Sequence, residues 1–459
     1  MFFAMNPILS GTFAFSWLVY VWDCYLARRQ RNLIRSSAHP PKEVRSLIDE
    51  ATFAKSRLYQ LDKSNFAFYH GVYSQMIATA FIFGGLPVSW YLAMIVTESI
   101  GYTFDDEFII TGIWVVIFSL FNFITELPWG IYSTFVIEEH HGFNKQTPAF
   151  FAKDKIKNLV VWIPIVVLIT VLLVYIIQWG GDYFFIYVWA FVFAVTLILA
   201  TVYPNYIAPL FDKFTLLPEG ELRTAIEDLA SGLKFPLTKL YVVEGSKRSA
   251  HSNAYLYGFF NNKRIVLFDT LLEDGLMPKD EEEEKKEEIK EKEEKESKEV
   301  HKKVGCNIEE ILAVLSHELG HWKFSHVLKN LVLMQAHTLL SFFAFGMLIN
   351  KTEVYVAFGF EGLKPTIIGL IIVFQFLFQP YNEILSFVIT QLTRRFEFQA
   401  DSFAKELKQA NALKSALMKL YKDNLGFPIA DPLYAAFNHS HPSLVERLRA
   451  LEDTRTKKD

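Results

Sequence analysis

Seven long apolar runs constrain what this chain of 459 residues can fold into. A helix needs about 20 mostly apolar residues to cross the hydrocarbon core of a bilayer, which is roughly 30 Å thick. Runs of that length are residues 8–26, 72–95, 108–135, 159–179, 184–207, 328–349 and 366–389. Any one of them could be a buried helix of a soluble protein, but seven together predict an all-α membrane protein with seven transmembrane helices.

The charged residues and the cysteines exclude two other classes of protein. The formal net charge is −4, and lysine and arginine nowhere alternate with aromatic residues in a basic stripe, so nucleic acid is not an expected partner. Cys24 and Cys306 provide no disulfide framework. The first apolar run lacks a basic segment before it and a cleavage pattern after it, so we expect it to be a retained membrane helix.

The charges between the apolar runs predict the orientation in the membrane. A cluster of lysine and arginine residues separates the first two runs, whereas the next connection is acidic. Because cytosolic loops are enriched in basic residues, the N-terminus is expected on the other side of the membrane. The chain then divides into residues 1–207 with five helices, a cytosolic segment 208–327, two helices in 328–390 and a cytosolic segment 391–459.

The segment 208–327 is expected to form a small α+β unit. Residues 219–232 and 307–322 have helical periodicity, and residues 239–243 and 264–268 are typical of strands. Residues 279–303 are nearly all glutamate and lysine, with many opposite charges four positions apart. This insert is compatible with a solvated helix or with disorder, and we assign it no chemistry.

A metal-binding motif follows the insert. His317 and His321 belong to the sequence His-Glu-Leu-Gly-His, which fits the H-E-x-x-H pattern on a predicted helix. Two histidines at i and i+4 share one helix face, about 5–6 Å apart, and can converge on a zinc ion. Glu318 lies one position after the first histidine, where it can act as the general base for an attacking water. The alternative without a metal is a structural helix with two surface histidines.

A catalytic zinc also needs a third protein ligand. The last two apolar runs form a hairpin, so the chain returns to the side of the membrane that it left. There, Glu397 and Asp401 stand four positions apart on one predicted helix face. We expect Glu397 to be the third ligand and Asp401 to hold the far nitrogen of a liganding histidine. The residues alone leave the reverse assignment open, as well as an exposed acidic helix face beside two arginines.

These segments together resemble the type 1 CAAX prenyl proteases, which are integral-membrane zinc proteases. The resemblance rests on motifs that span nearly the whole chain, namely residues 138–145, 246–255, 264–270, 317–323, 395–401 and 440–442. It implies a hollow barrel of seven transmembrane helices with the zinc site facing an internal chamber. It also implies removal of the C-terminal tripeptide from prenylated, commonly farnesylated, CAAX proteins, and some members make a second, upstream cut. By analogy, the protein is expected in the endoplasmic reticulum, and also in the inner nuclear membrane, with its catalytic side cytosolic.

The resemblance also suggests roles for three further residues. Asn253, His441 and Arg447 match positions that line the active site of that family. His441 is the candidate donor to the oxyanion of the tetrahedral intermediate, with Arg447 as its supporting charge. Asn253 stands beside a predicted strand to which an extended substrate could add. Without the resemblance, His441 is a residue at a helix entry and Asn253 an ordinary turn residue.

Three other functions compete with this interpretation. A site-2-type intramembrane protease also uses H-E-x-x-H, but its Leu-Asp-Gly motif is absent from the sequence. A membrane transporter or pore would be favoured by inverted repeats or paired broken helices, and the sequence has neither. A protein that only binds prenylated tails would not need Glu318.

Overall fold

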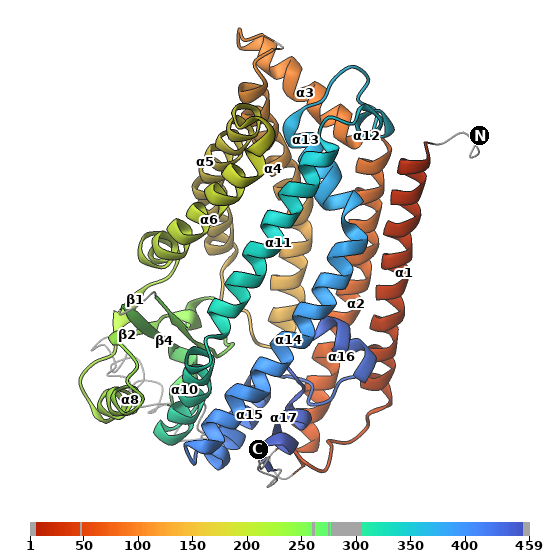
Figure 1. The fold of residues 1–459 in the computed structure, drawn as a ribbon. Coiled ribbons are helices and arrows are strands. Elements are labelled where there is room, and N and C mark those ends of the chain that lie inside the picture. Colours follow the sequence, from red (N-terminus) through yellow and green to blue (C-terminus); the bar gives the residue numbers. More distant parts are fainter. Residues whose placement is uncertain are drawn as a thin grey trace, which may run out of the picture.

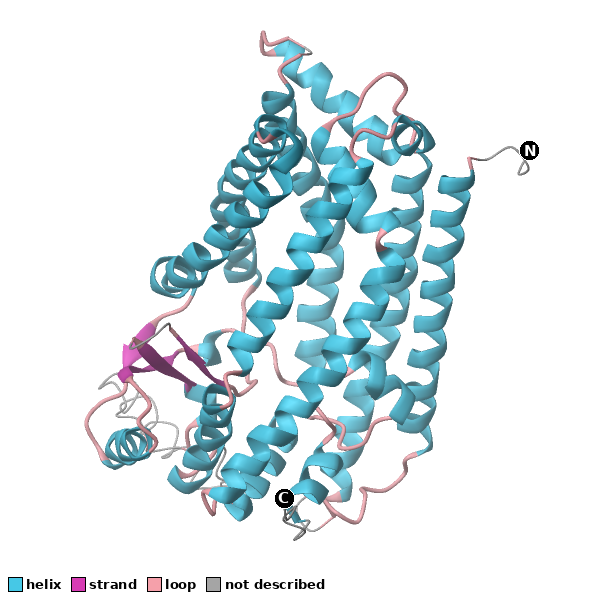
Figure 2. Cartoon of the chain, in the orientation of Figure 1, coloured by secondary structure: helices cyan, strands magenta, loops and turns pink. Residues whose placement is uncertain are grey.

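The computed structural model describes residues 6–45, 48–103, 105–258, 262–273, 276 and 305–452. The charged insert predicted at residues 279–303 lies outside these ranges. Long helices lie side by side through most of the molecule, and a small sheet lies at one end of them (Figures 1 and 2). The protein is therefore mostly helical with one small α+β part, in agreement with the coarse prediction.

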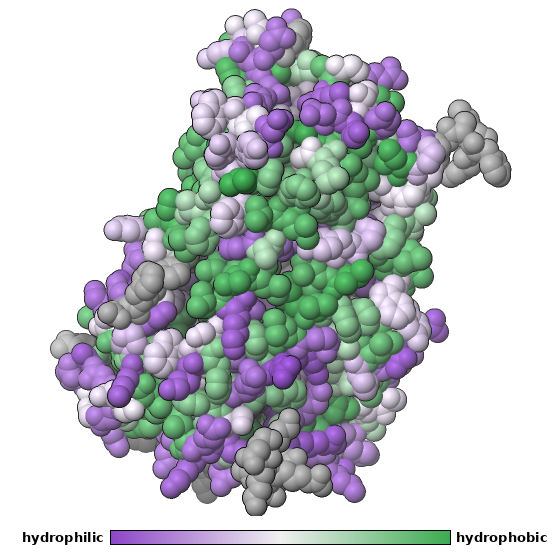
Figure 3. All heavy atoms as spheres, viewed as in Figure 1, coloured by the Kyte–Doolittle hydropathy of each residue, from purple (hydrophilic) through white to green (hydrophobic). Residues whose placement is uncertain are grey.

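The predicted apolar runs lie within long helical stretches, but the runs at 72–95 and 366–389 are each broken by a kink or bend. The long helices are α1 (Pro7–Ser36), α2 (Glu50–Ala80), α3 (Leu86–Ser99), α4 (Glu107–Tyr132), α5 (Pro148–Trp179), α6 (Phe184–Val202), α11 (His326–Leu348) and α14 (Gln379–Glu406). Ile124 on α4 and Val160 on α5 are each 65% exposed. Figure 3 shows such apolar residues gathered over the long helices, with polar residues toward both ends. Apolar surface of this extent is expected to face lipid.

Five helical stretches of the described chain are long and apolar enough to cross a membrane. They are Glu50–Ser99, Glu107–Glu138, Pro148–Trp179, Gly181–Phe211 and His326–Leu348. A sixth crossing results if Thr366–Leu377 and Gln379–Glu406, which meet at a bend of 62°, count as one span. Pro380 stands in the first turn after this bend, where its missing N–H costs no hydrogen bond. The first predicted run forms α1, which is long enough but less apolar than the others.

Shorter helices and helical turns connect these elements. They are η2 (Phe81–Gly85), η3 (Ser133–Glu138), η4 (Gly181–Tyr183), η5 (Tyr203–Ile207), α7 (Ala208–Phe211), η6 (Gly245–Lys247), η7 (Asp269–Leu271), α12 (Thr352–Ala357), α13 (Thr366–Ile371) and η8 (Ile372–Leu377). η2 is a π-helical turn in which Gly84 has a φ of 146°, so it kinks the otherwise continuous stretch from α2 to α3.

The sheet has four strands in the order β1-β2-β4-β3. They are β1 (Phe214–Leu216), β2 (Leu237–Val243), β3 (Ala254–Tyr257) and β4 (Lys263–Phe268). β2 and β4 are the two predicted strands, and they pair in parallel, whereas β1 and β3 add antiparallel edges. α8 (Glu221–Gly232) and α10 (Ile308–Lys323) pack on this sheet around buried residues such as Ile265, Leu267 and Ile311. Both predicted helices of the segment are confirmed.

α10 begins at a well-defined cap. The side chain of Asn307 accepts a hydrogen bond from the backbone N–H of Glu310, and the Glu310 carboxylate accepts one from the N–H of Asn307. This reciprocal arrangement satisfies two N–H groups that the helix itself cannot. Glu310 is only 4% exposed and also accepts hydrogen bonds from Ser415 and Lys419 on α15 (Ala410–Asp423), each at 2.6 Å. The start of α10 is thereby tied to the C-terminal helices.

The C-terminal helices surround the same end of the molecule (Figure 1). α14 passes from the long helices to α10, and it is followed by α15, α16 (Pro432–Asn438) and α17 (Leu444–Glu452). Buried residues of α15 and α17, including Leu413 and Leu448, share one core with Phe53 of α2. Segments from the start, the middle and the end of the chain therefore meet around α10.

We predict that Glu310→Gln lowers the free energy of unfolding by about 1–3 kcal/mol, because a buried, multiply bonded carboxylate loses its charge. Glu309→Gln, which changes an exposed neighbour, is the control and should shift it by less than about 0.5 kcal/mol. The midpoint of thermal unfolding in detergent measures the stability of both variants. Equal midpoints for the two variants would contradict the role assigned to Glu310.

The difference in stability between the wild type and Glu310→Gln should also depend on pH. Burial alone would raise the pKa of Glu310, but Lys419, Ser415 and the Asn307 N–H hold it below its ordinary value. A lowered pKa means that the stabilisation is complete above about pH 5 and is lost as pH falls below about 4. The wild type and Glu310→Gln should therefore unfold at converging temperatures in acid.

Candidate metal centre

The helix α10 presents both histidines of the H-E-x-x-H motif on one face. The Nε2 atoms of His317 and His321 lie 3.3 Å apart. His317 is buried and His321 is partly buried. Two imidazole nitrogens so close together in a protein interior suit a shared cation, because each offers a lone pair when it is neutral.

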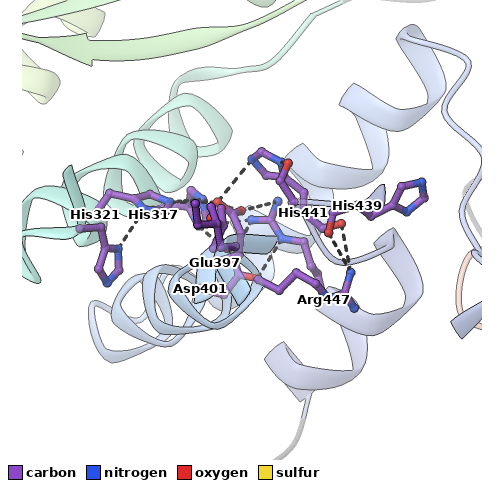
Figure 4. A network of polar contacts seen from close by, with 12 residues as sticks. His317, His321, Glu397, Asp401, His439, His441 and Arg447 are labelled. Atoms are coloured by element: carbon purple, nitrogen blue, oxygen red, sulfur yellow. Dashed lines mark hydrogen bonds and ion pairs between the residues drawn. The ribbon is translucent and has the colours of Figure 1, made fainter. Parts of the chain in front are cut away.

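The helix α14 brings a carboxylate to the same point. Glu397 is 3% exposed, and its Oε2 and Oε1 lie 3.5 Å from His317 Nε2 and 3.3 Å from His321 Nε2, respectively. The ligand atoms of the three residues all lie within 4.8 Å of one another. Figure 4 shows these side chains pointing toward one another from α10 and α14. The spatial convergence expected from the sequence is therefore present.

These three residues fit a metal ion chemically. Two imidazole nitrogens and one carboxylate oxygen are a common ligand set of catalytic metal sites in proteins. The Oε2 atom of Glu397 is buried and has no hydrogen-bond partner among the described residues. A buried carboxylate oxygen without a partner is costly, and a cation would satisfy it.

A glycine allows the two helices to approach. A Cβ atom added at Gly320 would lie 3.0 Å from Cα of Ala400 and 3.2 Å from Cβ of Phe403 on α14. Any larger residue at position 320 would therefore push α14 away from α10. Because Glu397 lies one helical turn before Ala400, this close packing sets the distance between the carboxylate and the two histidines.

Asp401 and Arg447 hold the other side of His317. Asp401 is 1% exposed, and its Oδ1 lies 2.9 Å from His317 Nδ1. Arg447 on α17 donates to both oxygens of Asp401, at 2.6 and 2.9 Å. The Nη2 of Arg447 also lies 3.2 Å from His317 Nδ1, but a guanidinium can only donate a hydrogen bond. The contact of Nδ1 with Asp401 is shorter, so Nδ1 donates its hydrogen bond to Asp401. Nδ1 then carries the proton, which leaves the Nε2 lone pair free for a metal.

Three further predicted residues lie around the cluster. His441, in the connection from α16 to α17, is 65% exposed, and its Nε2 lies 3.3 Å from Glu397 Oε1. Arg447 contacts Asp401 and, at 3.8 Å, Glu397, rather than His441. Glu318 is partly buried, and burial raises its pKa, although the neighbouring imidazoles oppose this. A carboxylate with a raised pKa takes up a proton more readily, as a general base must.

Comparisons with known proteins agree with this geometry. Residues 29–213 match the family model described as "CAAX prenyl protease N-terminal, five membrane helices", and residues 216–455 match "Peptidase family M48". The chain is 53% identical to the CAAX prenyl protease 1 homolog of Mus musculus, over 98% of this chain and 97% of that protein. It belongs to the type 1 CAAX prenyl protease family. The homolog from Homo sapiens is also 53% identical, over 98% of this chain and 96% of its own length.

One solved structure has the same fold as this chain. The crystal structure of S. mikatae Ste24p matches with a TM-score of 0.83 and 33% sequence identity, covering 97% of this chain and 99% of that chain. The protein is thus a metalloprotease of family M48 that is built on several membrane-spanning helices. The resemblance inferred from the sequence motifs is confirmed.

Asn253 in this protease precedes an edge strand. Its backbone carbonyl accepts a hydrogen bond from Phe268, and its side chain is exposed. β3, which begins at the next residue, pairs with β4 alone among the strands that the structure describes, and it contacts α10. The structure therefore places Asn253 at the start of an unpaired strand edge beside the helix that carries the motif.

Sequence reasoning missed His326, the first residue of α11. His326 is 2% exposed and stacks on Phe396 with ring centroids 4.0 Å apart. Its Nδ1 lies 3.0 Å from His321 Nδ1, and its Nε2 lies 3.0 Å from Gln399 Oε1. Because an amide oxygen only accepts, Nε2 carries the proton and Nδ1 accepts from His321. His321 Nε2 is thereby left free for a metal, as Nε2 of His317 is.

We predict that His326→Ala lowers the affinity for zinc by about 10–100-fold, because it removes the acceptor that orients His321. Competition with a chelating dye measures this affinity on purified protein. His326→Gln keeps a side-chain acceptor and should retain part of the affinity. His39→Ala, which changes an exposed histidine far along the chain, is the control. Equal affinities of His326→Ala and the wild type would contradict the assignment.

Proposed function

We propose that this protein is a zinc endopeptidase that removes the C-terminal tripeptide from prenylated CAAX proteins. The observation that carries the proposal is the buried cluster of His317, His321 and Glu397, with Glu318 beside it, in a chain of the prenyl protease family. The ligand set supports zinc as the metal, because two nitrogen ligands and one carboxylate ligand in a mostly buried site suit this ion. The names of the curated relatives support the class of substrate.

A zinc ion held by these residues would supply a Lewis acid for the scissile carbonyl and make the attacking water more acidic. Glu318 takes the proton of this water and later delivers it to the leaving amine. His441, exposed beside Glu397, donates to the oxygen on which negative charge develops. Asp401 and Arg447 act through His317 by fixing its tautomer and its orientation.

The substrate is proposed to bind as an extended strand. β3 has one edge that none of the other described strands covers, and it begins just after Asn253, next to α10. An extended peptide can add to such an edge through main-chain hydrogen bonds, which hold the chain in place irrespective of its side chains. This arrangement would position a carbonyl of the substrate across the face of α10 that carries both histidines.

We further propose that α1 makes a seventh crossing and that the helices form a hollow barrel. α1 has 30 residues, and it packs along α2, one of the spanning helices. A cavity of about 1520 Å³ lies between α1, α2 and the C-terminal helices. With the basic loop after α1 in the cytosol, the segments 208–327 and 391–459 and the metal centre also lie on the cytosolic side. The proposed location is the endoplasmic reticulum and the inner nuclear membrane.

Glu318→Gln tests the mechanism directly. We predict a loss of about a hundredfold to ten-thousandfold in the rate of tripeptide release from a farnesylated CAAX peptide, because the general base is removed. The zinc content should be unchanged, since Glu318 is not among the three clustered ligands. Glu309→Gln on the same helix is the control and should keep full activity. Substantial cleavage by Glu318→Gln would exclude the proposed base.

Removal of the metal should also abolish cleavage. A chelator is expected to stop tripeptide release by the wild type, and added zinc is expected to restore it because the ligands are held by the fold without the ion. In the Glu318→Gln variant, zinc should rebind without restoring the rate. Chelator-resistant cleavage by the wild type would argue against a metalloenzyme mechanism.

A further inference from the structure

The large cavity beside the metal centre has one strongly basic wall. The cavity has a volume of about 1520 Å³, and Arg447, which contacts Asp401 and Glu397, is one of its lining residues. Arg28, Arg31 and Arg35 of α1 and Lys63 of α2 also line it. We call these four residues the basic wall. The cavity and the metal centre thus share Arg447 and lie next to each other.

The arginines of the basic wall stand on one face of α1. Their spacing of three and four residues places them on adjacent turns, and the row rises about 10 Å along the helix. None of the three forms an ion pair with a carboxylate in the part of the chain that the structure describes, and Nε of Arg31 is buried without a hydrogen-bond partner there. In contrast, their neighbour Arg29 pairs with Asp431 at 3.0 Å.

Little negative charge in the cavity opposes the basic wall. Among the described lining residues, Asp23 is the one acidic residue, whereas the basic wall and Arg447 are all positively charged. Arg447 is already bound to both oxygens of Asp401. Unpaired arginines that face a cavity create a site for an anion, and a planar guanidinium binds a carboxylate with two parallel hydrogen bonds.

We propose that the basic wall binds the α-carboxylate at the C-terminus of the peptide that is cut. This inference rests on the proposed function. Removal of a tripeptide requires that the free carboxylate lie three residues beyond the scissile bond, which is about 10 Å in an extended chain. A row of cations in the cavity that Arg447 links to Glu397 would fix this distance. The wall thereby places the cut that removes the tripeptide three residues before the free carboxylate.

The test compares two farnesylated CAAX peptides, one with a free C-terminal carboxylate and one with a C-terminal amide. For the wild type, kcat/KM should favour the free acid by about tenfold or more, mainly through KM, because a charge-assisted contact is lost in the amide. In the double variant with Arg31→Gln and Arg35→Gln, this preference should fall to about one. The ratio of the two rates cancels any loss of folded protein.

Two further variants separate charge from geometry. Replacing both arginines by lysine keeps the charge and should retain part of the preference, whereas Lys55→Gln, at an exposed position of α2 outside the cavity, should retain all of it. Equal rates for the two peptides with the wild type, or an unchanged preference in the double glutamine variant, would overturn the inference. So would a loss of activity that follows anionic lipid content and not the peptide terminus. Failure to cleave either peptide would instead count against the proposed function.

Discussion

The close contact of α10 with α14 is the constraint on which the metal centre depends. The two helices meet at Gly320 and Ala400, where no larger side chain fits without displacement. This contact brings Glu397 within 3.5 Å of both histidines. A metal centre tolerates errors of only a few tenths of an ångström in its ligand positions. The helix packing therefore determines the chemistry, and the glycine inside the motif is as necessary to the geometry as the histidines beside it.

Polar partners reinforce this packing from behind each histidine. Asp401, held by Arg447, fixes the remote nitrogen of His317, and His326, held by Gln399, fixes that of His321. These groups are mostly buried, where hydrogen bonds are stronger than in water and where an unpaired group is costly. Each imidazole is thus kept in the tautomer that leaves Nε2 free, before any ion binds.

The sequence predicted the parts of the site that local spacing encodes. His317 and His321, and likewise Glu397 and Asp401, share a helix face because they stand four residues apart, and β2 and β4 were recognised because their apolar runs are long enough. β1 and β3 have only three and four residues, so their pairing depends on neighbours and not on their own pattern. His326 was missed because a turn at Ser325, with a φ of 55°, folds it back under His321. The contact of Arg447 with Asp401 could not be predicted, because the two residues stand 46 positions apart in the sequence on different helices.

The order of the ligands along the chain bears on how the protein is made. His317 and His321 precede α11, and Glu397 follows the bent segment formed by η8 and α14. During synthesis, the ribosome exposes the two imidazoles well before the carboxylate, and the carboxylate returns to them only after both apolar segments are in place. Until the carboxylate arrives, the two imidazoles form an incomplete chelate with weak affinity for a metal ion. Stable binding of the ion therefore requires correct membrane insertion of both segments, and a wrongly inserted chain would lack a complete metal site.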